Sequence, residues 1–137
     1  MVQDSVGNVW VGTLSGLNQM DYATHKCRRF FHNPDNPSSL SDDVVTDLFY
    51  DSRRQLWIGT DGGGLMRMIE PGVFKSYGKK GELPSLAIQS IEEDTSGCLW
   101  ISTKNGLVKF DPVTESFIIW LIPKIFLAMS LIGIVVP

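Results

Sequence analysis

Few residues of this 137-residue chain have the types and spacing that catalysis requires. Glycoside cleavage uses two carboxylates at a fixed separation, and the best candidates are the adjacent pairs Asp42-Asp43 and Glu92-Glu93. Successive residues of a strand point to opposite faces of a sheet, so neither pair could act on one bond. We therefore expect no catalytic residue and no enzyme activity.

The cysteines and histidines do not suggest a site either. Cys27 and Cys98 give no Cys-x-x-Cys motif and no zinc-ligand spacing, and a disulfide between them is not favoured. His25 and His32 are isolated and are expected at the surface. The net charge is −3 with both signs interleaved, which leaves no basic stripe for nucleic acid. The sequence predicts no metal, no cofactor and no nucleic-acid partner.

A segment that occurs three times is the strongest signal in the chain. Its copies are Asp4–Thr13 (DSVGNVWVGT), Asp51–Thr60 (DSRRQLWIGT) and Asp94–Thr103 (DTSGCLWIST). A period of about 40–50 residues is typical of repeat architectures, which commonly form a scaffold for binding.

The second copy belongs to the most complete repeat. Residues 44–50, 55–60, 65–69 and 73–77 are predicted strands separated by tight turns. Radial repetition of such four-stranded sheets gives a β-propeller, and no 3.6-residue period supports a helical solenoid. The predicted fold is all-β: an incomplete β-propeller of antiparallel four-stranded blades with a hydrophobic C-terminal tail.

The expected boundaries follow from the repeat. Residues 1–37 form a partial first blade and a linker, 38–80 the second blade, 81–117 an incomplete third blade and 118–137 an apolar tail. Only Val2-Gln3 precede the first turn, and the fourth strand of the third blade should begin near Ser116-Phe117.

The recurring residues are expected to be structural. Each tryptophan packs between neighbouring sheets, each aspartate accepts backbone N–H bonds in a turn, and the small residues permit close approach or a positive φ. The threonines that end the second strands are expected to form hydrogen bonds. The predicted structural residues are Trp10, Trp57, Trp100, Asp4, Asp51, Asp94, Gly12, Gly59, Gly16, Gly64 and Gly106.

Residues that vary at equivalent positions are better binding candidates. They lie in the links between second and third strands, at Leu14-Ser15, Asp61-Gly62-Gly63 and Lys104-Asn105. Loops on a rigid scaffold commonly carry function. The candidate ligand contacts are Asp61, Lys104 and Asn105.

The pattern D-x-x-G-x-L-W-x-G-T with G-L-x-x-x-D resembles the two-component regulator propeller repeat over residues 2–117. The segment HNPDNPSSLSDDVVTDLFYD is similar to the linker between repeats of that family. The resemblance implies a fragment of the periplasmic sensor region of a Bacteroidetes-like hybrid two-component protein, which detects oligosaccharides. The family's histidine kinase has no counterpart in this sequence. The alternative is a structural or protein-interaction blade array that is membrane-tethered or self-assembling.

The chain ends differ in character. Met1-Val2-Gln3 run directly into the first turn without a signal peptide. Phe117–Pro137 carries one charge, Lys124. Residues 118–137 are interpreted as a membrane segment, as a buried strand pair turning at Gly133, or as non-native sequence from a shifted reading frame. An incomplete ring has open faces, so we expect self-association or further blades as partners beside an oligosaccharide.

Overall fold

The computed structural model describes residues 1–120, which form three four-stranded antiparallel sheets. The first sheet, blade 1, contains β1 (Val2–Gln3), β2 (Val9–Thr13), β3 (Gly16–Met20) and β4 (Cys27–Phe30). Blade 2 contains β5 (Val45–Tyr50), β6 (Leu56–Thr60), β7 (Leu65–Glu70) and β8 (Val73–Tyr77). Blade 3 contains β9 (Ile88–Glu93), β10 (Leu99–Thr103), β11 (Gly106–Asp111) and β12 (Ser116–Trp120). The strands of each blade pair in chain order.

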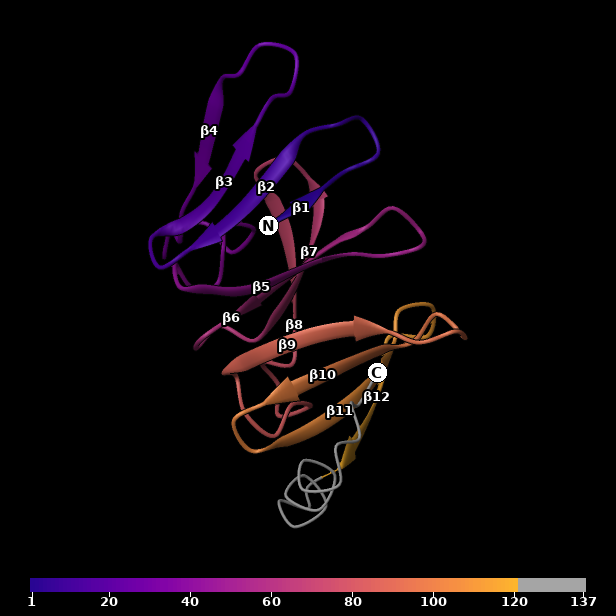
Figure 1. Cartoon of the computed structure of the whole chain (residues 1–137). Coiled ribbons are helices and arrows are strands. Elements are labelled where there is room, and N and C mark those ends of the chain that lie inside the picture. The colour runs from indigo at the N-terminus through magenta and orange to yellow at the C-terminus, as the bar shows by residue number, and fades with distance from the viewer. Residues whose placement is uncertain (121–137) are drawn as a thin grey trace.

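The three blades stack one after another and, within residues 1–120, do not close into a ring (Figure 1). The first strand of each blade packs on the preceding blade: β5 contacts β1 and β2, and β9 contacts β5 and β6. One buried hydrophobic cluster lies between blades 1 and 2, and a second lies between blades 2 and 3. The prediction of an all-β array of antiparallel four-stranded blades is confirmed.

The fourth strand of blade 3 begins at Ser116, where the sequence predicts it. It continues through Ile118, Ile119 and Trp120, which the sequence analysis assigned to the apolar tail. These three residues pair with β11 in regular register. The interpretations of the tail from residue 121 onward fall outside the described residues. No helix within residues 1–120 is long and apolar enough to span a membrane.

An aspartate and a tryptophan six residues apart form the same hydrogen-bonded unit in every blade. Asp51 Oδ1 accepts the backbone N–H groups of Arg53 and Gln55 at 2.9 and 2.8 Å. Its Oδ2 accepts the Trp57 indole N–H at 2.8 Å. The corresponding indole bonds are Asp4–Trp10 at 3.0 Å and Asp94–Trp100 at 2.9 Å. One carboxylate thus holds the turn and the indole ring of the following strand.

The tryptophans of blades 1 and 2 lie in the clusters between blades. Trp10 and Trp57 are fully buried, and the Trp57 ring lies 5.4 Å from Phe110 of the next blade. Trp100 is only half-buried, because no described blade follows blade 3. Burial of each tryptophan therefore depends on the next blade.

Glycine is required where the first strand of the next blade crosses the second strand. A Cβ atom on Gly59 would lie 2.6 Å from Ile88 Cγ2, and one on Gly12 would overlap Val45 Cγ1. In blade 3 the equivalent residue is Ser102, whose hydroxyl lies 2.6 Å from that of Ser90. In blades 1 and 2 the glycine is therefore needed because a side chain of the next blade lies against it.

A second glycine position connects blades 1 and 2 to the linker that follows each of them. Gly16 and Gly64 have φ values of +102° and +76°, and Gly106 has +155°. The N–H of Gly16 donates to the Asp43 carbonyl at 2.6 Å, and that of Gly64 donates to the Leu86 carbonyl at 3.0 Å. A left-handed backbone, which glycine adopts without strain, aims these N–H groups at the next linker.

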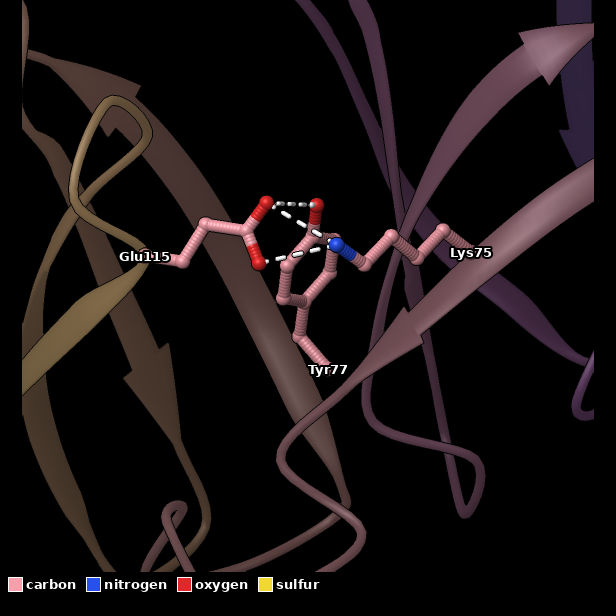
Figure 2. A network of polar contacts seen from close by, with 3 residues as sticks. All are labelled: Lys75, Tyr77 and Glu115. Carbon is pink, nitrogen blue, oxygen red and sulfur yellow. Dashed lines mark hydrogen bonds and ion pairs between the residues drawn. The ribbon is translucent and has the colours of Figure 1, made fainter.

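A polar network joins the outer strand of blade 2 to the turn before β12 in blade 3 (Figure 2). Lys75 Nζ donates to both carboxylate oxygens of Glu115 at 2.9 Å, and the Tyr77 hydroxyl donates to the same carboxylate at 3.3 Å. The hydrogen bond with Lys75 lowers the pKa of Glu115 and raises the pKa of Lys75. Both side chains are well exposed, so this ion pair adds about 1 kcal/mol or less to stability.

We predict that Gly59→Ser lowers the free energy of unfolding by about 1–3 kcal/mol, because the added Cβ overpacks Ile88. The matched control is Ser102→Ala at the equivalent position of blade 3, which should change stability by about 0.5 kcal/mol or less. Urea unfolding measures both. Equal losses in the two variants would contradict the proposed crossing.

A second prediction concerns acid stability. The Ser96 hydroxyl and then the Trp100 indole lower the pKa of Asp94 from 3.8 to about 2. Because the folded-state pKa lies below the unfolded one, this carboxylate stabilises the fold above about pH 4, and that contribution is lost as the pH falls towards 2. Asp94→Asn should thus be less stable than wild type at pH 5, and the difference should shrink by pH 2.

Urea unfolding across that pH range tests the Asp94 prediction. Glu92→Gln, a change at an exposed carboxylate two residues earlier, is the control and should follow the wild-type curve. A difference between wild type and Asp94→Asn that stays constant with pH would contradict the linkage.

Candidate ligand-binding loops

The turns between second and third strands lie on one side of the blade stack (left in Figure 1). We call this the loop side; it comprises Leu14-Ser15, Asp61–Gly63 and Lys104-Asn105. A threonine anchors each turn. Thr60 Oγ1 donates to the Gly64 carbonyl and accepts the Gly63 N–H, both at 2.9 Å. The same paired bonds occur at Thr13 and Thr103, which confirms the hydrogen-bonding role expected of these residues.

The turn of blade 2 is one residue longer than the other two, since four positions rather than three separate its threonine from the glycine. It docks on the linker before β5. Ser41 Oγ donates to the Gly63 carbonyl at 2.9 Å, and a Cβ on Gly63 would overlap that hydroxyl. A Cβ on Gly62 would lie 2.9 Å from Asp42 Oδ2. The linker therefore supports this turn and leaves no room for a Cβ atom at Gly63.

The three predicted contact residues lie where they can reach solvent. Asp61, Lys104 and Asn105 are exposed, and within residues 1–120 their side chains make no hydrogen bond. Asp61 and Lys104 hold equivalent places, since their N–H groups donate to the carbonyls of Val44 and Ala87 before the first strands. The structure places opposite charges on successive blades of the loop side but does not pair them, since the ion pair found within residues 1–120 is Lys75–Glu115.

The adjacent carboxylates that were considered as catalytic pairs accept hydrogen bonds that hold parts of the fold together. Asp42 Oδ1 accepts the Val44 N–H at 3.0 Å, and Asp43 Oδ1 accepts the His32 N–H at 2.6 Å. Both aspartates precede β5, so the argument from strand alternation does not apply to them. Glu93, in β9, accepts two bonds from Ser52 of blade 2.

Sequence reasoning missed the hydrogen bonds inside the linker before β5. His32 Nδ1 lies 2.6 Å from the Leu40 carbonyl, and Ser39 Oγ accepts the Asn33 N–H at 2.8 Å. The polar composition of this linker indicated a connection, but spacing alone did not show that it folds back on itself.

One hollow lies away from the loop side. It has a volume of about 390 Å³ and is open to solvent, at the β3–β4 hairpin of blade 1. Its lining residues are Gln19, Asp21, Thr24, Lys26, Cys27 and Arg28. Residues 1–120 contain no group of three His, Cys, Asp or Glu side chains placed to hold a metal ion.

Residues 39–62 and 82–105 match the family model described as two component regulator propeller. These two segments are two-component regulator propeller repeats. Each covers the first two strands of a blade and includes the Asp–Trp unit, with Asp51 and Trp57 in one and Asp94 and Trp100 in the other. No curated protein matches the chain significantly.

Solved propeller domains share the fold. An extracellular domain from B. thetaiotaomicron, described as belonging to a one component system, matches with TM-score 0.72 and 22% identity over 88% of this chain and 18% of its own. An extracellular domain of a hybrid two component system from the same organism gives TM-score 0.57 and 25% identity, over 85% of this chain and 22% of its own. The chain thus spans about a fifth of these two domains.

Virginiamycin B lyase from Staphylococcus aureus matches with TM-score 0.67 and 18% identity, over 89% of this chain and 40% of its own. At that identity the likeness concerns the fold alone. These structures show that the blades have the propeller fold, and the family match assigns residues 39–62 and 82–105 to the two-component regulator propeller type.

We predict that Gly63→Ala lowers the free energy of unfolding by about 1–2 kcal/mol, because its Cβ overlaps the Ser41 hydroxyl. Asp61→Ala in the same turn should change stability by about 0.5 kcal/mol or less, because its side chain is exposed and unbonded within residues 1–120. Thermal unfolding of both variants measures this. A larger loss for Asp61→Ala would show that Asp61 is a structural residue.

Proposed function

We propose that this chain is part of the ligand-sensing propeller of a hybrid two-component signalling protein, and that its loop side binds an oligosaccharide. The observation that carries the proposal is the row of anchored turns, in repeats that match a regulator family, with polar side chains that have no partner within residues 1–120. Two structural neighbours are extracellular domains, which supports a periplasmic location in the parent protein.

The side chains of the loop side suit sugar hydroxyl groups. The Asp61 carboxylate accepts hydrogen bonds, the Lys104 ammonium donates them, and the Asn105 amide does both. The threonine bonds hold the backbone of these turns in place before a ligand arrives, which reduces the entropy lost on binding. The nearby carboxylates of Asp42 and Asp43 already accept hydrogen bonds from backbone N–H groups, which supports a site that binds a ligand without catalysis.

A structural or protein-interaction array is the alternative function. It is favoured by one observation, the exposed apolar residues Ile118, Ile119 and Trp120 on the outer strand of blade 3. The two functions use different surfaces, so separate substitutions distinguish them.

Calorimetric titration of the full chain with a panel of oligosaccharides tests the proposal. We expect at least one ligand whose binding weakens about tenfold or more in Lys104→Ala and Asp61→Ala, as loss of a hydrogen bond to a charged group predicts. Lys26→Ala, which alters the hollow of blade 1, is the matched control and should bind as wild type. Binding lost in Lys26→Ala but kept in Lys104→Ala would move the site to that hollow. No binding by the folded chain would contradict the proposal.

A further inference from the structure

Blades 1 and 2 each carry a cation at the same place on their fourth strand. Lys75 lies two residues before Tyr77 on β8, and its Nζ lies 5.1 Å from the centre of that ring. Arg28 lies two residues before Phe30 on β4, and its Cζ lies 4.9 Å from the centre of that ring. In both blades the aromatic residue pairs with the leucine that follows the positive-φ glycine. Arg28 and Lys75 are thus equivalent residues.

Lys75 has a carboxylate partner from the next blade. Its Nζ donates to both oxygens of Glu115 at 2.9 Å (Figure 2). Glu115 belongs to the turn between β11 and β12, which contains four residues because Asp111 pairs with Ser116. The chain therefore shows that a cation at this position can bind a carboxylate.

Arg28 has no such partner within residues 1–120. The turn of blade 2 that faces it, between β7 and β8, contains only two residues, because Glu70 pairs with Val73. This shorter turn puts Gly72 beside Arg28, where a Cβ atom would lie 3.6 Å from Arg28 Nη2. Arg28 is exposed, and no carboxylate of residues 1–120 lies within ion-pair distance of it.

The space beside Arg28 is the hollow at the β3–β4 hairpin. Gln19, which also lines it, pairs with both Trp10 and Arg28, so these side chains share the face that blade 1 turns towards blade 2. The hollow therefore belongs to the junction of two described blades, where the shorter turn of blade 2 leaves it uncovered. Its volume of about 390 Å³ lies within the range of about 300–1,000 Å³ that is typical of small-molecule sites.

The lining of the hollow suits a carboxylate that also carries hydroxyl groups. Arg28 and Lys26 supply positive charge, and the planar guanidinium fork matches the two oxygens of a carboxylate. Gln19 and Thr24 can donate and accept hydrogen bonds. Asp21 Oδ1 accepts two backbone N–H groups at 2.9 Å, which leaves Oδ2 to accept a hydroxyl of a ligand.

We propose that this hollow binds a small carboxylate with hydroxyl groups, the chemistry of a sugar acid. The carboxylate of the ligand takes the place beside Arg28 that the Glu115 carboxylate takes beside Lys75. The hydroxyl groups meet the uncharged polar side chains and the free oxygen of Asp21. Because the hollow lies away from the loop side, this inference does not rest on the proposed function.

NMR titration of the full chain with methyl β-D-glucuronide tests the proposal. We expect shifts in the backbone signals of residues 19–28, and a dissociation constant that rises about tenfold in Arg28→Gln, as loss of hydrogen bonds to a charged group predicts. Arg29→Gln is the matched control. It removes the same charge from the next residue of β4, whose side chain points to the opposite face, and should bind as wild type.

Matched ligands test the two parts of the chemistry. Methyl β-D-glucoside has a CH₂OH group in place of the carboxylate and should bind about tenfold more weakly or worse. N-Acetylglutamate amide offers the carboxylate of an acidic peptide without sugar hydroxyls and should also bind more weakly than the glucuronide. Lys104→Ala should bind the glucuronide as wild type, so this test and that of the loop side can fail separately.

Four results would overturn the proposal. The first is the absence of shifts at about 10 mM glucuronide, ten times a millimolar dissociation constant. The second is an equal loss in Arg28→Gln and Arg29→Gln, which would indicate attraction by net charge. The others are equal binding of the glucoside, and tighter binding of the glutamate amide, which would assign the hollow to an acidic peptide.

A second measurement needs no arginine variant. Cys27 lines the hollow and is exposed, and in Cys98→Ser it is the remaining thiol. Glucuronide at about ten times its dissociation constant should slow alkylation of Cys27 by iodoacetamide about tenfold, since the unliganded fraction falls by that factor. The glucoside at the same concentration should leave the rate unchanged. An unchanged rate with the glucuronide would contradict binding in the hollow.

Discussion

The hydrogen bond from each tryptophan indole to an aspartate carboxylate six residues earlier is the interaction on which the blades depend. The same carboxylate accepts two backbone N–H groups, so it sets the turn between first and second strands and fixes the ring at once. In blade 2 this bond is buried, where an unpaired carboxylate or indole would cost several kcal/mol. A fixed ring then gives the next blade a constant surface to pack on, and the array can repeat.

Each blade is completed by its neighbour rather than by itself. A side chain from the first strand of the next blade packs directly against the glycine of the second strand. Ile88, for example, packs against Gly59 and leaves no space for a Cβ atom there. Backbone hydrogen bonds tie the turns to the linkers, and those of Asp61 and Lys104 to the residue before the first strand of their own blade place them at equivalent positions. The burial of Trp10 and Trp57 thus follows from a nearest-neighbour construction, in which each blade covers the one before it.

The repeat spacing was sufficient to predict the blades, because three similar segments containing tryptophan imply three similar sheets. The bond between Asp51 and Trp57 was not predicted, since spacing alone does not show that a turn side chain meets the next strand. The support of Gly63 by Ser41 joins residues far apart in sequence and needed the tertiary structure. The sequence placed the end of blade 3 at residue 117 because Ile118–Trp120 are apolar. The same composition is equally compatible with an outer strand, which these residues form.

Hydrogen exchange of the indole N–H groups, followed by NMR, tests the central claim most directly. The chain has four tryptophans, so four signals are expected, each assigned from a Trp→Phe variant. The account predicts that Trp10 and Trp57 exchange slowest, that Trp100 is also protected, and that Trp120, which lies outside the Asp–Trp units, exchanges fastest. A Trp57 indole that exchanges as fast as that of Trp120 in the folded chain would contradict it.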